Sequence, residues 1–105
     1  MKSIYQDPAY TPEERAKALL EEMTLEEKMA QVNCVFPFGE QYDDLEQISA
    51  GTPFGIGEVS TLEMRRIESL EEAARWQRKA QETVMRNSPH HIPSMFHMEG
   101  LCGAF

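Results

Sequence analysis

The final stretch of the chain, Ile92-Pro93-Ser94-Met95-Phe96-His97-Met98-Glu99-Gly100-Leu101-Cys102-Gly103, carries the clearest signals of a fold and of a functional site. Residues 92–96 predict a short buried strand. The run is apolar, it is too short for a helix, and its proline lies near the start, where a missing N–H costs least. Glu99 follows just beyond this strand. Because barrels and open α/β sheets hold their ligands at strand ends, Glu99 is the main candidate for a substrate-binding residue.

The part of the chain before this stretch predicts an alternation of strands and helices. Residues 32–36 predict a strand that ends at a proline, and residues 43–48 predict a short helix. A glycine-rich strand over residues 55–59, where a backbone can approach a neighbour closely, precedes a long helix over residues 69–86. This order favours βαβ units and a parallel sheet. Three strands do not close a barrel, so residues 32–105 predict the beginning of a larger α/β fold with two open sheet edges.

The first third of the chain, residues 1–31, predicts an extended arm followed by two helices. Residues 1–10 are the arm. Thr11 is a cap residue followed by a proline and two acids, which is the pattern of a helix start. Thr24 with Glu27 three residues later is a capping box, so a second helix begins there after a bend.

The helix over residues 69–86 is the best defined element of the sequence. Ser69 and Glu72 form a further capping box at its start. Asn87 is expected as its C-cap, and the proline that follows shortly afterwards prevents continuation. Trp76 is expected to pack against the core. The apolar face is expected to contain Leu70, Ala73, Ala74, Ala80 and Val84.

The composition is that of one ordinary globular domain. The chain has 105 residues, 41% of them hydrophobic and 27% charged, and a formal net charge of −8. No basic stripe is present, so nucleic acid and anionic membranes are poor partners. The first residues contain no apolar segment typical of a signal peptide, which favours a cytoplasmic location. Export of the full-length protein stays an alternative.

The titratable residues give no established metal or cofactor motif. His97 and Glu99 match the His-x-Glu of zinc deaminases, but those enzymes need a later Pro-Cys-x-x-Cys, and here only Cys102 follows. His90 and His91 point opposite ways in an extended segment, so we expect two loop residues. The two cysteines have neither metal-ligand spacing nor the pattern of a disulfide framework. We therefore expect no metal and no cofactor.

Three stretches together resemble the N-terminal end of glycoside hydrolase family 3, the β-glucosidase and β-xylosidase family. Tyr5-Gln6-Asp7-Pro8 with Thr11-Pro12-Glu13-Glu14-Arg15 resembles the opening arm and first helix. Met23-Thr24-Leu25-Glu26-Glu27-Lys28, completed by Gln31, is similar to a motif of the family. Residues 92–103 resemble its Ile-Pro-…-Phe-His-x-Glu-x-Leu-His-Gly segment. The order and spacing of the stretches agree over nearly the whole chain.

The resemblance implies a retaining, exo-acting enzyme that hydrolyses β-linked sugars and has a (β/α)8-like barrel. This chain would be the first, incomplete part of the barrel, covering residues 1–105. The resemblance gives Glu99 the role of binding sugar hydroxyls. The nucleophile and the acid/base, which retaining enzymes place about 5–5.5 Å apart, would lie beyond residue 105. No catalytic residue is therefore assigned, and the chain alone is expected to be inactive.

Two positions depart from the family pattern. Cys102 stands where the family often has histidine, which removes a polar group beside the sugar site. His91 stands where glycine commonly precedes Ile-Pro, which affects the loop conformation. The same motifs leave open a β-N-acetylglucosaminidase or a phosphorylase of the family. A different class also stays open, namely a small acidic interaction or scaffold module without catalysis. The sugar, the linkage and the oligomeric state are left open by the sequence.

Overall fold

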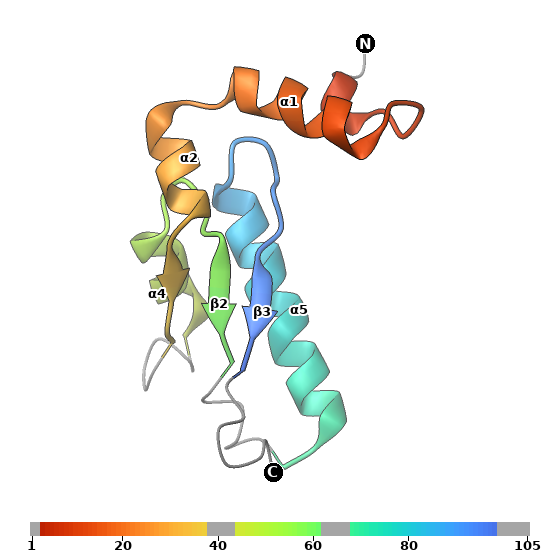
Figure 1. The fold of residues 1–105 in the computed structure, drawn as a ribbon. Helices are drawn as coiled ribbons and strands as arrows, with labels where there is room; N and C mark the ends of the chain where they lie inside the picture. Colours follow the sequence, from red (N-terminus) through yellow and green to blue (C-terminus); the bar gives the residue numbers. More distant parts are fainter. Residues whose placement is uncertain (1–2, 38–43, 62–67, 99–105) are drawn as a thin grey trace.

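The computed structural model describes residues 3–37, 44–61 and 68–98, and shows helices and strands in alternation (Figure 1). The predicted site residue Glu99 and Cys102 lie outside the described residues. The elements in chain order are η1 (Ile4–Gln6), α1 (Pro12–Glu22), α2 (Leu25–Gln31), β1 (Cys34–Val35), α4 (Leu45–Gly51), β2 (Glu58–Ser60), α5 (Leu70–Asn87) and β3 (Met95–His97).

The N-terminal helices begin where their capping residues predict. The Thr11 side chain accepts a hydrogen bond from the Glu14 N–H, and the Glu14 carboxylate accepts one from the Thr11 N–H. Thr24 and Glu27 repeat this arrangement at the start of α2. Each box satisfies backbone donors that a helix end leaves without partners. The arm before them is not wholly extended as predicted, because the short 3-10 helix η1 lies within it.

The three strands form one parallel sheet in the order β1-β2-β3, as the alternation predicts. Each strand is shorter than predicted. The strand β1 lies within its predicted range, whereas β2 and β3 begin and end later than predicted. Around β3 the reason is local. The Ile92 N–H donates to Ser88 Oγ (3.0 Å) and the Ser94 N–H donates to Gln81 Oε1 (2.8 Å). Residues 92–94 therefore use their hydrogen bonds outside the strand pairing, and the ladder begins only afterwards.

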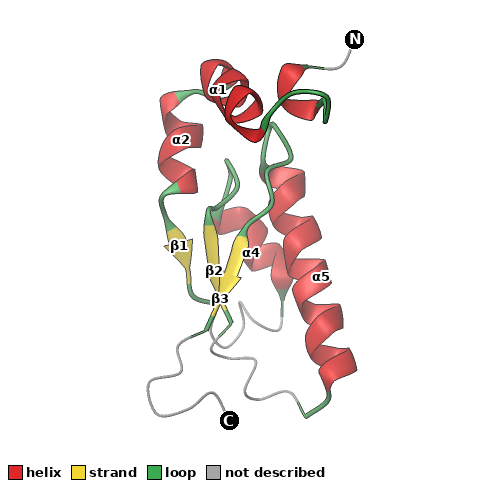
Figure 2. Ribbon diagram, turned by 45° about the vertical axis from the view of Figure 1, so that its right-hand side comes forward, coloured by secondary structure: helices red, strands yellow, loops and turns green. Residues whose placement is uncertain are grey.

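One face of the sheet is covered by helices α4 and α5 (Figure 2). Val59 in the central strand is fully buried there, against Ile48 of α4 and Val84 of α5. Val35 and Phe96 pack beside Val59 from the two edge strands. These three strand residues are in register, so they share one face. The hydrophobic core is this contact between the sheet and its two helices.

The predicted face of the long helix α5 is confirmed at Ala80 and Val84, which are fully buried, and is wrong near the start of the helix. Leu70 is 90% exposed, and Ala74 is exposed as well. The buried side is formed by Ala80, Thr83 and Val84, while Trp76 packs against the core as expected. The reason is that α5 is much longer than the strands that it covers, so its first turn extends beyond the sheet (Figure 1). Among the described residues, Leu70 in this turn has no sheet residue to pack against.

The predicted C-cap of α5 has another function. Asn87 is the last helical residue and Ser88 is the C-cap. The Asn87 side-chain amide donates to the carbonyl oxygens of Ser49 (2.8 Å) and Thr52 (3.0 Å). It thereby satisfies backbone acceptors at the end of α4. Asn87 joins the two helices that cover the sheet.

Two backbone positions favour a small residue, one because a neighbour approaches closely and one because of its backbone conformation. A methyl group on Gly57 would overlap the carbonyl group of Gln31, and the Gly57 N–H donates to the Ala30 oxygen (3.0 Å). This confirms the close backbone approach expected in the glycine-rich strand. His91 has φ 54°, in the left-handed region that favours glycine, at the position where the resemblance leads us to expect glycine.

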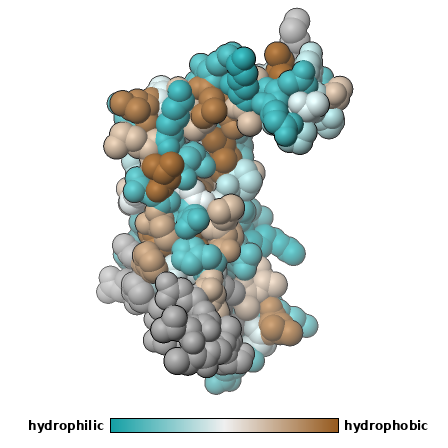
Figure 3. All heavy atoms as spheres, in the orientation of Figure 1, coloured by the Kyte–Doolittle hydropathy of each residue, from teal (hydrophilic) through white to brown (hydrophobic). Residues whose placement is uncertain are grey.

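None of the helices in residues 3–37, 44–61 and 68–98 combines the length and the apolar character needed to cross a bilayer. The helix α5 has 18 residues, and its exposed side is charged. Hydrophobic atoms do reach the surface around α2 (Figure 3), where Leu25, Met29 and Val32 are exposed.

Candidate functional site

The second face of the sheet carries the polar and reactive side chains. Cys34 and Glu58 are paired in register on β1 and β2, and Met95 is the next partner on β3. His97 lies two residues beyond Met95, so it projects from the same face. Met95 is 65% exposed, which shows that neither helix covers this side. The open face is therefore the place where described side chains are able to meet a ligand.

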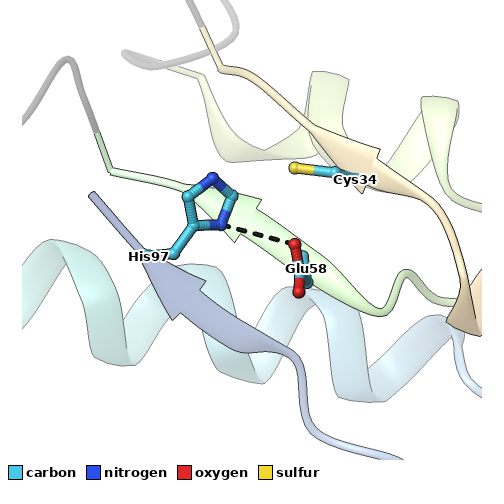
Figure 4. A group of neighbouring side chains, drawn as sticks. All are labelled: Cys34, Glu58 and His97. Atoms are coloured by element: carbon cyan, nitrogen blue, oxygen red, sulfur yellow. Dashed lines mark ion pairs between the residues drawn. The ribbon is translucent and has the colours of Figure 1, made fainter. Parts of the chain in front are cut away.

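Three of these side chains come together, one from each strand. Cys34, Glu58 and His97 place a sulfur, a carboxylate oxygen and a ring nitrogen within 4.8 Å of one another. Figure 4 shows the three side chains converging above the sheet. His97 Nδ1 lies 3.6 Å from Glu58 Oε2, which is an ion-pair distance only if the ring is protonated. The sequence reasoning considered His97 but missed its neighbours, because they lie 39 and 63 positions earlier in the chain.

The cluster is half-buried. The side chains of His97 and Glu58 are 35% and 43% exposed, and the Phe36 ring meets the His97 ring edge-on with centroids 6.2 Å apart. His97 Nδ1 itself is buried and finds no hydrogen-bond partner among the described residues. A buried polar atom without a partner is unfavourable, so this nitrogen marks a position where a ligand atom would be stabilised.

The electrostatics of the cluster disfavour a second negative charge. Burial, followed by the negative charge of Glu58, raises the pKa of the Cys34 thiol, while a hydrogen bond from the Ser60 backbone lowers it by less. The thiol is therefore more fully protonated near neutral pH than an exposed cysteine. A cation in the cluster would reverse this effect, because it would stabilise both the thiolate and the carboxylate.

A cleft of about 280 Å³ continues from Cys34 and Glu58 along the same face. Gln31 lies in its wall, and the side-chain nitrogen of Gln31 is buried without a hydrogen-bond partner in the described part of the chain. The complete lining is Gln31, Val32, Asn33, Cys34, Gly57, Glu58, Pro93 and Met95. The polar cluster and the cleft form one surface that extends across all three strands.

The predicted site residue Glu99 follows β3 closely, and the described backbone fixes the strand that leads to it. The oxygen of His97 accepts hydrogen bonds from both the N–H (2.8 Å) and the hydroxyl (2.9 Å) of Thr61. Further back, the Gln81 amide bonds to the Ser94 backbone in both directions, at 2.8 and 2.9 Å. The end of β3 is thus held by Thr61, which follows β2, and the residue before its start is held by α5. The position of Glu99 itself lies outside the described residues.

The two other histidines lie in the loop between α5 and β3, as predicted. His90 Nε2 lies 3.1 Å from Glu27 Oε2, and the ring meets Tyr5 edge-on with centroids 5.8 Å apart. His91 Nδ1 lies 3.2 Å from the Met85 oxygen. The two rings thus contact different parts of the chain. His90 connects this loop with the N-terminal helices, and neither ring takes part in the Cys34 cluster.

Comparison with known proteins places this fold among glycosidase structures. No family model matches the chain, and a comparison with curated protein sequences finds no match. The chain is similar to the solved structure of a β-glucosidase, EmGH1 from Erythrobacter marinus, with a TM-score of 0.73 and 31% sequence identity. The match covers 90% of this chain and 13% of that enzyme's chain. The chain therefore corresponds to a small part of the solved structure that it matches.

This likeness supports the expected relation to glycoside hydrolases in its general form. It extends over nearly all of the chain, and a parallel α/β arrangement is common to the sequence prediction and to the structure.

Proposed function

We propose that this chain is the first part of the barrel of a family 3 glycoside hydrolase, which hydrolyses β-linked sugars with retention of configuration. The observation that carries the proposal is the similarity to a β-glucosidase at 31% identity over 90% of the chain. The motifs around Thr24 and in residues 92–103 favour family 3 among the glycoside hydrolases. The substrate would be a β-glycoside cleaved from its non-reducing end.

The two faces of the sheet are consistent with a place in a barrel wall. In (β/α)8 barrels the helices lie outside, and the inner face of the strands carries side chains toward the axis. Here α4 and α5 cover the face of Val59, and the opposite face carries Glu58 and His97. Among the described residues, the edge strands β1 and β3 each have one side without a paired strand. Those sides would pair with further strands of the barrel.

The proposed role of Glu99 is to bind the sugar. A carboxylate at the end of a barrel strand accepts hydrogen bonds from two neighbouring hydroxyl groups, and the negative charge strengthens both. The chemistry itself needs two further carboxyl groups on either side of the scissile bond. The proposal assigns both of them to barrel segments outside these 105 residues. The isolated chain would then bind sugar weakly and hydrolyse nothing.

The test is a substitution of Glu99 in the full-length protein, as the source cells make it. We expect Glu99→Gln to lower kcat/KM for an aryl β-glucoside by about 100-fold or more, because charged hydrogen bonds contribute about 1.5–3 kcal/mol each. Glu71→Gln, at an exposed carboxylate in the first turn of α5, is the matched control and should leave kcat/KM unchanged.

The outcomes separate the parts of the proposal. A Glu99→Gln variant as active as the wild type would remove Glu99 from the sugar site. Preference for N-acetylglucosaminides, or a need for phosphate in place of water, would select one of the two related enzymes. Failure of the wild-type protein to cleave any aryl β-glycoside would refute the proposed hydrolase activity. It would favour the alternative of a non-catalytic interaction or scaffold module.

A further inference from the structure

We propose that Cys34, Glu58 and His97 bind a zinc ion across the three strands of the sheet. The inference concerns the open face itself and does not depend on glycoside hydrolysis. The sequence predicts no metal site, because the three residues are widely separated along the chain. The fold removes this separation by pairing β1, β2 and β3 in parallel.

The distances suit ligands of one ion better than they suit direct contacts. The separation of 3.6 Å between His97 Nδ1 and Glu58 Oε2 is too long for a hydrogen bond. Two such atoms bound to one tetrahedral zinc ion lie about 3.4 Å apart, given ordinary Zn–N and Zn–O bond lengths. The sulfur of Cys34 completes a triangle whose atoms all lie within 4.8 Å. Binding would require side-chain rotations that bring all three donors to about 2.0–2.3 Å from the ion.

The donor set selects the metal. A thiolate, an imidazole and a carboxylate suit zinc, whereas magnesium and calcium take oxygen ligands. Three protein ligands leave one tetrahedral position open, and the side chains of Glu58 and His97 are exposed enough for water to fill it. Binding would also provide the missing partner for His97 Nδ1, which is buried without a hydrogen bond in the described part of the chain.

A bound ion would have a structural consequence. Only two or three residues of each strand pair in the sheet, and none of the helices in residues 3–37, 44–61 and 68–98 covers this face. Zinc would join β1, β2 and β3 on the side opposite the hydrophobic core. Because an ion that binds the folded state alone stabilises it, the melting temperature should rise with the concentration of free zinc.

The experiment measures zinc and cobalt binding to the chain at its natural length, after removal of metals with a chelator under reducing conditions. We expect one zinc ion per chain, and a near-ultraviolet charge-transfer band from a cobalt–thiolate bond. Cys34→Ser should abolish the band and weaken zinc binding by about 100-fold or more. Cys102→Ser is the matched control, since it also removes one thiol, and it should keep both the band and the affinity.

Two further variants keep the test informative if Cys34→Ser folds poorly. Glu58→Gln and His97→Gln alter single ligands, and each should weaken zinc binding while circular dichroism remains that of the wild type. Zinc binding that survives in both variants, or that is lost equally in Cys102→Ser, would overturn the proposal. So would the absence of stoichiometric zinc from the wild-type protein. None of these results depends on hydrolytic activity.

Discussion

The two faces of the small sheet differ in what the chain provides for them. The face of Val35, Val59 and Phe96 is apolar and is covered by two helices of the same chain. The face of Cys34, Glu58 and His97 is polar, carries an exposed methionine, and is left open. Within the described residues, stability is therefore concentrated on one face and chemistry on the other. Neighbouring residues on a strand should respond very differently to substitution.

The largest expected effect tests the covered face. Val59→Ala should lower the free energy of unfolding by about 2–3 kcal/mol, because it removes two methyl groups from a fully buried position. Its neighbour Glu58 projects from the open face, so Glu58→Gln in metal-free protein should change the free energy of unfolding by less than about 0.5 kcal/mol. Urea denaturation of both variants gives the comparison. Equal losses would show that the two faces do not differ as described.

A smaller effect, on reactivity, tests the open face. Because burial and the charge of Glu58 raise the pKa of Cys34, alkylation of this thiol in metal-free protein should have a pH midpoint above that of a free cysteine. Glu58→Gln removes the negative charge and should lower the midpoint. The rates are measured in a Cys102→Ser background, so that Cys34 is the only thiol observed within these 105 residues. A midpoint unaffected by Glu58→Gln would mean that the two side chains do not interact.

The smallest expected effect on stability concerns the loop between α5 and β3. His91→Gly should raise the free energy of unfolding by about 0.5–1 kcal/mol, because glycine adopts positive φ without steric cost. The adjacent His90 contacts Glu27 and Tyr5 and does not have positive φ, so His90→Gly should be destabilising. Thermal melts of the two variants should move in opposite directions. A destabilising His91→Gly would contradict this account of the loop.

Local signals gave the correct order of helices and strands. Thr11 and Thr24 have their capping partners within three residues, so the starts of α1 and α2 could be read directly from the sequence. The role of Asn87 could not be read in this way. Its partners Ser49 and Thr52 lie 38 and 35 positions away, and only the packing of α4 on α5 brings them to its side chain.

The candidate site shows the same distinction. The position of Glu99 after a strand is a local inference, and the structure describes the strand but not that residue. The cluster of Cys34, Glu58 and His97 depends on the register of three strands, which no single segment specifies. The available signal was one polar or reactive residue next to an apolar one in each of the three strands. Their common face became visible only with the pairing.

The most direct test of the central claim uses the protein at the length that its cells produce. The measurement follows the hydrolysis of an aryl β-glucoside by proton NMR and records the anomer that is released first. If the proposed function is right, the β anomer appears first, since a retaining enzyme forms a covalent intermediate that water then opens. Release of the α anomer, or no cleavage of any β-glycoside, would contradict the assignment of this chain to a retaining glycoside hydrolase.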